Sequence, residues 1–190
     1  MMILSTVGCK MKTYIALLRG INVSGQKKIR MADLKAHLEE LGWEGIQTYI
    51  QSGNIIFRSN DNDPGLLAFA IQQKLKDKCG FDVPTLVLFP EALKRLIRNN
   101  PFTRDPGKAA NRLYVTFLFS LPGVDLASQL QAHKKHNEHF VLQDNFIFLY
   151  YPDGYGRAIM NNNAFEKVLK VEATTRNWNT VNKLYEMALT

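Results

Sequence analysis

Two successions of apolar segments follow one another in the same order, and this repetition constrains the fold more than any other feature of the chain. In the first, the apolar run YIALL at residues 14–18 precedes a helical pattern and then a hairpin pattern. In the second, YVTFL at 114–118 precedes the same two patterns. Short apolar runs of this length are typical of buried strands. The sequence therefore indicates an internal duplication.

The first succession can be followed to its end. Apolar residues at Met31, Leu34, Leu38 and Leu41 repeat with helical spacing, and Gly42 follows as a left-handed cap. The segments IQTYIQ and NIIFRS flank a Ser-Gly pair that suits a hairpin turn. Next, an Asp-Pro pair starts a helix that runs to a glycine, and VPTLVLF forms a strand. The expected order is βαββαβ.

The second succession differs from the first in one connection. The hairpin sequences YIQSGNIIF at 49–57 and FVLQDNFIF at 140–148 correspond, with Asn54 and Asn145 in matching places. Between strand and helix, however, the first half has the long loop RGINVSGQKKIR, where the second has only FSLPGVD. Extra loop length of this kind is more often functional than structural. The tail beyond Asn161 is expected to be helical.

Composition fits an ordinary globular protein with an acidic partner. The chain has 190 residues, of which 46% are hydrophobic, and its 24 Lys and Arg against 17 Asp and Glu give a net charge of +7. We expect the partner to be an anionic small molecule or a nucleic acid. The segment SGNIIFRS lacks the basic and alternating aromatic residues of an RRM stacking strand, so that type of RNA binding is not expected.

The cysteines and the N-terminus suggest a cytoplasmic protein. Cys9 and Cys79 form no CxxC pair or disulfide framework, as suits a reducing compartment. No stretch approaches the length of a membrane helix, so no membrane partner is expected. Residues 1–10 are interpreted as an extension, with Met11 as an alternative first residue.

Three segments, ALLRGINVSGQKKIRM, TYIQSGNIIF and TTRNWNTVNKL, closely resemble the signature segments of a bacterial family, domain of unknown function sixteen ninety-seven. The resemblance extends from about Met11 to the C-terminus. It implies an α+β protein made of two ferredoxin-like halves, which we place at residues 11–90 and 91–190. It implies no activity, no cofactor and no catalytic residue.

The long loop is the first candidate binding segment. Gly20 and Gly25 have the G-x-x-x-x-G spacing of a P-loop, but no Lys directly follows the second glycine, so nucleotide hydrolysis is not expected. Anion binding by freed backbone amides remains open, as does a merely solvated basic loop. The candidate ligand-binding residues of this loop are Arg19, Gly20, Asn22, Gly25, Lys27 and Lys28.

The segment TTRNWNT, residues 174–180, is the second candidate. On a helical wheel Trp178 falls on the apolar side, and Arg176, Asn179 and Thr180 fall on an outward, donor-rich side. One reading makes this segment a capping and packing element with Asn177 as the cap. The other brings Arg176 and Asn179 to the basic loop to complete an anion pocket.

The remaining polar patterns are weaker. Gln51 and Asn54 flank the hairpin turn, where they either serve the turn itself or contact a ligand beside the loop. His133, His136 and His139 recur every three residues, a spacing that spreads them too widely on a helix for a metal site. No metal site is predicted.

Three functions stay open at this level. The first is a cytosolic binding protein for an anionic or phosphate-bearing ligand. The second is an enzyme acting on a small metabolite, with Arg176 and Asn22 orienting the substrate. In the third, the signature residues serve the structure alone. The sequence leaves the oligomeric state and the identity of the ligand undetermined.

Overall fold

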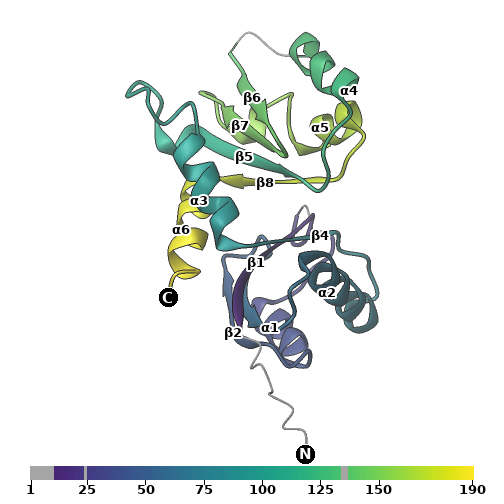
Figure 1. Cartoon of the computed structure of the whole chain (residues 1–190). Coiled ribbons are helices and arrows are strands. Elements are labelled where there is room, and N and C mark those ends of the chain that lie inside the picture. Colours follow the sequence, from purple (N-terminus) through teal and green to yellow (C-terminus); the bar gives the residue numbers. More distant parts are fainter. Residues whose placement is uncertain (1–10, 24, 134–136) are drawn as a thin grey trace, which may run out of the picture.

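The computed structural model describes residues 11–23, 25–133 and 137–190, and it contains two four-stranded antiparallel sheets with flanking helices (Figure 1). The fold is therefore of the α+β class, as expected. The predicted extension at residues 1–10, which includes Cys9, lies outside the described residues, and so does His136.

The first sheet has the strand order β2-β3-β1-β4. Its elements follow one another in the expected βαββαβ order: β1 (Lys12–Leu18), α1 (Met31–Glu39), β2 (Glu44–Tyr49), β3 (Asn54–Ser59), α2 (Pro64–Cys79) and β4 (Thr85–Leu88). The start and end of α2 form as predicted. The Asp63 carboxylate accepts hydrogen bonds from the amides of Gly65 and Leu66 at 2.7 and 3.4 Å, and Gly80 takes a left-handed conformation with φ of 77°.

The second sheet repeats this arrangement with the strand order β6-β7-β5-β8. Helix α3 (Pro90–Asn99) leads into it. The other elements are β5 (Leu113–Leu118), α4 (Val124–Gln129), β6 (His139–Gln143), β7 (Phe146–Tyr150), α5 (Asn162–Leu169), β8 (Ala173–Asn177) and α6 (Trp178–Met187), with short 3-10 turns at Ala110–Arg112, Leu130–His133 and Tyr155–Arg157. The two halves thus share element order and strand order, in agreement with two ferredoxin-like units.

Strand β8 corrects the expectation of a wholly helical tail. Residues 173–177 pair with β5 in antiparallel register, so the helical wheel begins only at Trp178. As a result Arg176 and Thr180 do not form an outward face: both are buried. The strand escaped notice because its sequence, ATTRN, carries polar groups whose partners come from distant parts of the chain.

The two sheets face one another across a shared apolar layer. In β1, Tyr14, Ala16 and Leu18 pack toward α1 and α2, while Ile15 and Leu17 pack toward the second sheet. Being buried on both faces explains why this strand is a continuous apolar run. Helices α3 and α6 lie side by side along the shared layer (Figure 1) and Trp178, 7% exposed, belongs to it as predicted.

The hairpin turns show that the repeat is offset by one residue from the expected match. The amide of Leu18 donates to the Gly53 carbonyl at 2.8 Å, and the amide of Leu118 donates to the Asn145 carbonyl at 2.9 Å. Asn145 therefore occupies the place of Gly53, and the expected correspondence with Asn54 is wrong. The reason is turn length: residues 50–53 connect β2 to β3, whereas only 144–145 connect β6 to β7.

Gly53 is the most constrained glycine of the first half. Its φ is 73°, and a Cβ built on it would lie 2.6 Å from Leu18 Cβ and 2.9 Å from Ile21 Cδ1. We expect Gly53→Ala to lower the free energy of unfolding by about 3 kcal/mol, since backbone strain and overpacking add. Urea denaturation of the purified protein measures this value.

Gly42→Ala is the matched control, because Gly42 has a φ of 74° and nothing within 4 Å of an added Cβ. This variant should lose only about 1 kcal/mol, from the left-handed backbone alone. Equal losses in the two variants would show that the close approach to Leu18 has no energetic weight.

Candidate functional site

A buried arginine from the second half binds the strand ends of the first half. Arg176 is 6% exposed, and its Nε donates to Asn54 Oδ1 at 2.5 Å. Its Nη2 donates to the carbonyl of Leu18 at 2.7 Å and to those of Ser52 and Gly53 at 3.0 and 3.3 Å. The guanidinium therefore joins β8 to the end of β1 and to the hairpin turn of the other sheet.

The charge of Arg176 has no acidic partner within the part of the chain that the structure describes. Burial lowers the pKa of Arg176 to about 10, which leaves the guanidinium protonated at neutral pH. Carbonyl and hydroxyl dipoles solvate it instead, including Thr174 Oγ1 at 2.7 Å and the Thr175 carbonyl at 2.9 Å from Nη1. A buried positive charge without a counter-ion makes its surroundings electropositive.

Two other predicted ligand residues have their side-chain amides engaged within the chain. Asn54 is fully buried, and its Nδ2 donates to the Tyr49 carbonyl and to Ser52 Oγ at 3.0 and 2.9 Å. Asn22 Nδ2 donates to the carbonyls of Ile29 and Gln51, both at 2.9 Å, while its Oδ1 accepts from the Ile29 amide. Asn22 thus closes the long loop and ties it to the hairpin.

A cavity of about 580 Å³ opens beside Arg176, between the long loop of the first half and the start of α5 in the second. Three sets of residues line it: from the first half Leu18, Arg19, Gly20, Ile21, Val23 and Ser52; from the turn before α5 and its first residues Tyr155, Gly156, Ala158, Asn161, Asn162 and Asn163; and from β8 Thr174, Thr175 and Arg176. We call this cavity the interlobe cavity. The loop and the Arg176 region therefore meet, as one reading of the sequence expected.

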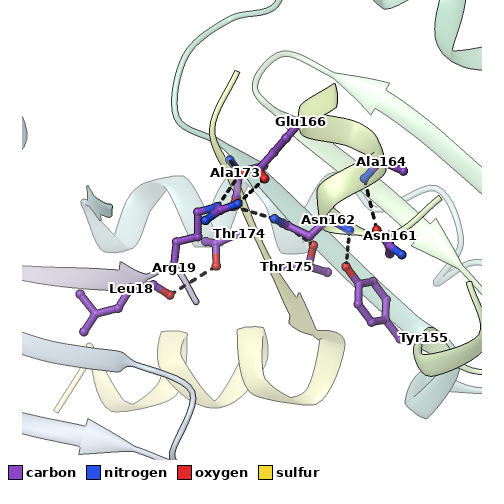
Figure 2. A network of polar contacts seen from close by, with 10 residues as sticks. All are labelled: Leu18, Arg19, Tyr155, Asn161, Asn162, Ala164, Glu166, Ala173, Thr174 and Thr175. Carbon is purple, nitrogen blue, oxygen red and sulfur yellow. Dashed lines mark hydrogen bonds and ion pairs between the residues drawn. The ribbon is translucent and has the colours of Figure 1, made fainter. Parts of the chain in front are cut away.

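Arg19 lies on the wall of the interlobe cavity and pairs with Glu166 of α5. Its Nε donates to Glu166 Oε1 at 2.6 Å, and its Nη2 contacts Oε2 (Figure 2). This hydrogen-bonded pairing raises the pKa of Arg19. Glu166 Oε1 also accepts from the Ala173 amide at 2.7 Å, so the carboxylate holds Arg19 in place from the other half.

The start of α5 supplies a second set of donors. Asn161 caps the helix through a hydrogen bond from the Ala164 amide at 3.2 Å. Asn162 Nδ2 donates to the Ala173 carbonyl, and its Oδ1 accepts from Thr175 Oγ1 at 3.1 Å (Figure 2). These contacts fix the N-terminus of α5, the positive end of its dipole, at the cavity wall.

Several N–H groups of the interlobe cavity have no partner among the described residues. The amides of Gly20 and Ile21 donate no hydrogen bond there, and Arg19 keeps its Nη1 free after binding Glu166. Gly20 has a φ of 73°, a conformation in which successive amides turn toward one side of the chain. These N–H groups can donate hydrogen bonds to an acceptor in the cavity.

Tyr155 is the other ionisable residue of this wall with a shifted pKa. Its hydroxyl accepts from the Asn162 amide at 2.7 Å, and burial raises its pKa. Tyr155 and Arg176 therefore both stay protonated at neutral pH. They can donate hydrogen bonds or hold charge, but neither is poised to exchange protons near pH 7.

Six of the ten predicted site residues line one of two cavities, and the other four line neither. Arg19, Gly20 and Arg176 line the interlobe cavity, whereas Asn22, Lys28 and Gln51 line a second cavity of about 460 Å³ against α1 and α2. The other four, Gly25, Lys27, Asn54 and Asn179, line neither.

Two of those four have evident roles elsewhere. Lys27 Nζ donates to the Asp82 carbonyl at 2.5 Å, and the Asn179 amide donates to the Asn177 side chain that caps α6.

Sequence reasoning missed the contribution of α5. The run of three asparagines at 161–163 is a capping signal that could have marked this helix start. Glu166 and Tyr155 carry no comparable signal, because their roles depend on where the fold places Arg19 of the first half and Thr175 of β8.

Within residues 11–23, 25–133 and 137–190, no three His, Cys, Asp or Glu side chains gather closely enough to hold a metal ion. Over the same ranges, no helix combines the length and the apolar character needed to cross a bilayer.

Fold and cavity together define an α+β protein with two four-stranded sheets and a cavity lined from both halves of the chain. The chain belongs to the family described as "Protein of unknown function (DUF1697)", which it matches over residues 11–148. Among solved structures, the conserved bacterial protein SP0830 from Streptococcus pneumoniae is similar, at 26% identity and a TM-score of 0.63 over 94% of this chain and 99% of that one. None of the curated proteins matches the sequence significantly.

The hydrogen bonds of Arg176 predict a large energetic role. Arg176→Ala removes the donor to Asn54 Oδ1 and to the Ser52 carbonyl and one of the two donors to the carbonyls of Leu18 and Gly53, so we expect the free energy of unfolding to fall by about 4 kcal/mol. Arg176→Lys keeps the charge but cannot reach all of these oxygens, and should lose about 2 kcal/mol. Chemical denaturation monitored by tryptophan fluorescence gives both values.

Arg30→Ala is the control, since Arg30 is exposed and its ion pair within the described part of the chain is with Asp33, three residues further on. Its denaturation midpoint should stay close to that of the unaltered protein, because exposed ion pairs contribute little to stability. An Arg176→Ala variant as stable as this control would contradict the assigned role.

Proposed function

We propose that this protein is a cytosolic binding protein for a small anionic ligand, bearing phosphate or carboxylate, that occupies the interlobe cavity. The observation that carries the proposal is the excess of positive charge and of donors on its wall. Arg19 and Arg176 face it, and Glu166 offsets only one of these two charges. The N-terminus of α5 adds the positive end of a helix dipole.

The unpartnered N–H groups support an anion rather than a neutral ligand. Buried amides that lack a protein partner are costly unless water or a ligand accepts from them. Ile21 is 1% exposed, yet its amide has no acceptor among the described residues. An anionic oxygen beside Gly20 and Ile21 would satisfy this amide and the free Nη1 of Arg19 together.

The ionisable groups favour binding over catalysis. A concave cavity that contains shifted pKa values is the arrangement an enzyme would also have. Here, however, the shifted pKa values leave Tyr155 and Arg176 protonated at neutral pH, so neither is suited to act as a general acid or base there. The sequence suggested that Asn22 and Arg176 could orient a substrate. Their side chains already form hydrogen bonds within the protein, where Asn22 holds the loop and Arg176 holds the strand ends.

The shape of the cavity favours a small molecule over a nucleic acid. Nucleic acids are bound through exposed cationic surfaces that follow the phosphate backbone. The interlobe cavity instead presents a half-buried Arg19 and a buried Arg176 at the end of a recess. A compact anion can reach such groups more readily than a polymer can.

Substitutions at the Arg19–Glu166 pair should change affinity in opposite directions. Arg19→Ala leaves Glu166 unpaired on the cavity wall, so we expect binding of inorganic phosphate to fall by at least tenfold. Glu166→Gln removes the competing carboxylate but keeps an acceptor for the Ala173 amide, so affinity should rise about threefold or more. Isothermal titration calorimetry at low ionic strength measures both.

Lys28→Glu is the control, because Lys28 lines the second cavity. It should leave phosphate affinity within about twofold, since exposed charges at a distance are screened. Loss of binding in Lys28→Glu with retention in Arg19→Ala would place the anion in the second cavity and refute the proposal.

A further inference from the structure

The interlobe cavity is much larger than a simple anion requires. Cavities that bind organic ligands enclose roughly 300–1,000 Å³, and this one encloses about 580 Å³. An inorganic phosphate placed against Arg19 and the start of α5 would leave most of that volume to water. The rest of the cavity can hold an organic group attached to the anion. We call the anionic group of such a ligand its head and the organic group its body.

Two apolar side chains outside the core of the first half line the cavity, Val23 and Ala158. Val23 is 57% exposed although it lines the cavity, whereas the side chains of Leu18 and Ile21 are buried in that core. Leaving an aliphatic side chain in water at a cavity wall forgoes the free energy that its burial would provide. Contact with the apolar part of a ligand would recover it.

The long loop is built to hold Val23 in this position. The Gln26 amide donates to the Val23 carbonyl at 2.9 Å, in a tight turn that contains the left-handed Gly25. One residue before Val23, the Asn22 side chain fastens the loop to Gln51 and Ile29. These contacts explain the extra length of the first-half loop, because they hold the Val23 side chain at the cavity.

We infer that the ligand of the interlobe cavity is an organic anion with an apolar body, whose head binds Arg19 and the α5 N-terminus and whose body packs on Val23. This inference rests on the proposed anion-binding function and adds the class of ligand to it. An aromatic phosphomonoester and an aromatic carboxylate share the required chemistry. The side chains of Ser52 and Asn163, also on the wall, can hydrogen-bond to polar edges of the body.

Calorimetry with two probes that differ only in the body tests the inference. Phenyl phosphate should bind at least about tenfold more tightly than inorganic phosphate, because its ring buries apolar area that phosphate lacks. Val23→Ser should weaken phenyl phosphate about fivefold and leave inorganic phosphate unchanged. Val124→Ser is the control, since Val124 is 86% exposed and lies outside the cavity, and it should alter neither affinity.

The outcomes separate this inference from the function on which it rests. Equal affinities for the two probes, or an unchanged phenyl phosphate affinity in Val23→Ser, would overturn the inference and leave anion binding intact. Failure of both probes to bind the unaltered protein would overturn the proposed function itself. Benzoate that binds with the same dependence on Val23 would support the inference with a carboxylate as the head.

The melting temperature of each variant, measured without ligand, shows whether the substitution disturbs folding. Val23 is exposed, so Val23→Ser should melt within about 2 °C of the unaltered protein. An equal loss of affinity for both probes would show that Val23→Ser disturbs the head site, and would count against the assignment of Val23 to the body.

Discussion

The guanidinium of Arg176 is the interaction on which the arrangement of the two halves depends. It satisfies carbonyls at the end of β1 and in the β2–β3 turn, and it does so from β8 of the other sheet. Leucine or methionine in its place would supply none of these donors and would leave the Ser52 carbonyl without the hydrogen bond from Arg176. The guanidinium suits this position because it offers five N–H donors, and its charge also acts on the neighbouring cavity.

The interlobe cavity lies where the two halves of the chain differ. Both halves place a loop after their first strand, but only the first has the length to fold back as Asn22 and Gly25 require. Apposed to it, the start of α5 supplies the donors of the second half. A site made from one loop of each unit is reminiscent of the way ligands occupy domain interfaces in general.

Much of the fold was predictable because local rules act within each segment. The βαββαβ order, the α2 caps and the buried Trp178 follow from spacing, caps and apolar runs, and the structure agrees. The site was only half predictable. Arg176 and Asn179 were expected to meet the basic loop; Arg176 lines the same cavity as Arg19, but Asn179 does not. Strand β8 was missed, since Arg176 is satisfied from more than 100 positions away. Glu166 was missed for the same reason.

The separation in sequence between Arg176 and its acceptors also bears on how the molecule is made. The partner carbonyls lie 123 to 158 residues earlier in the chain. During translation, domains fold as they emerge from the ribosome. The first sheet can therefore assemble while the carbonyls at the end of β1 and in the β2–β3 turn still bind water. They exchange this water for Arg176 only after β8 has been synthesised. The interlobe cavity, which residues 174–176 of β8 help to line, can therefore be complete only after this strand has been synthesised.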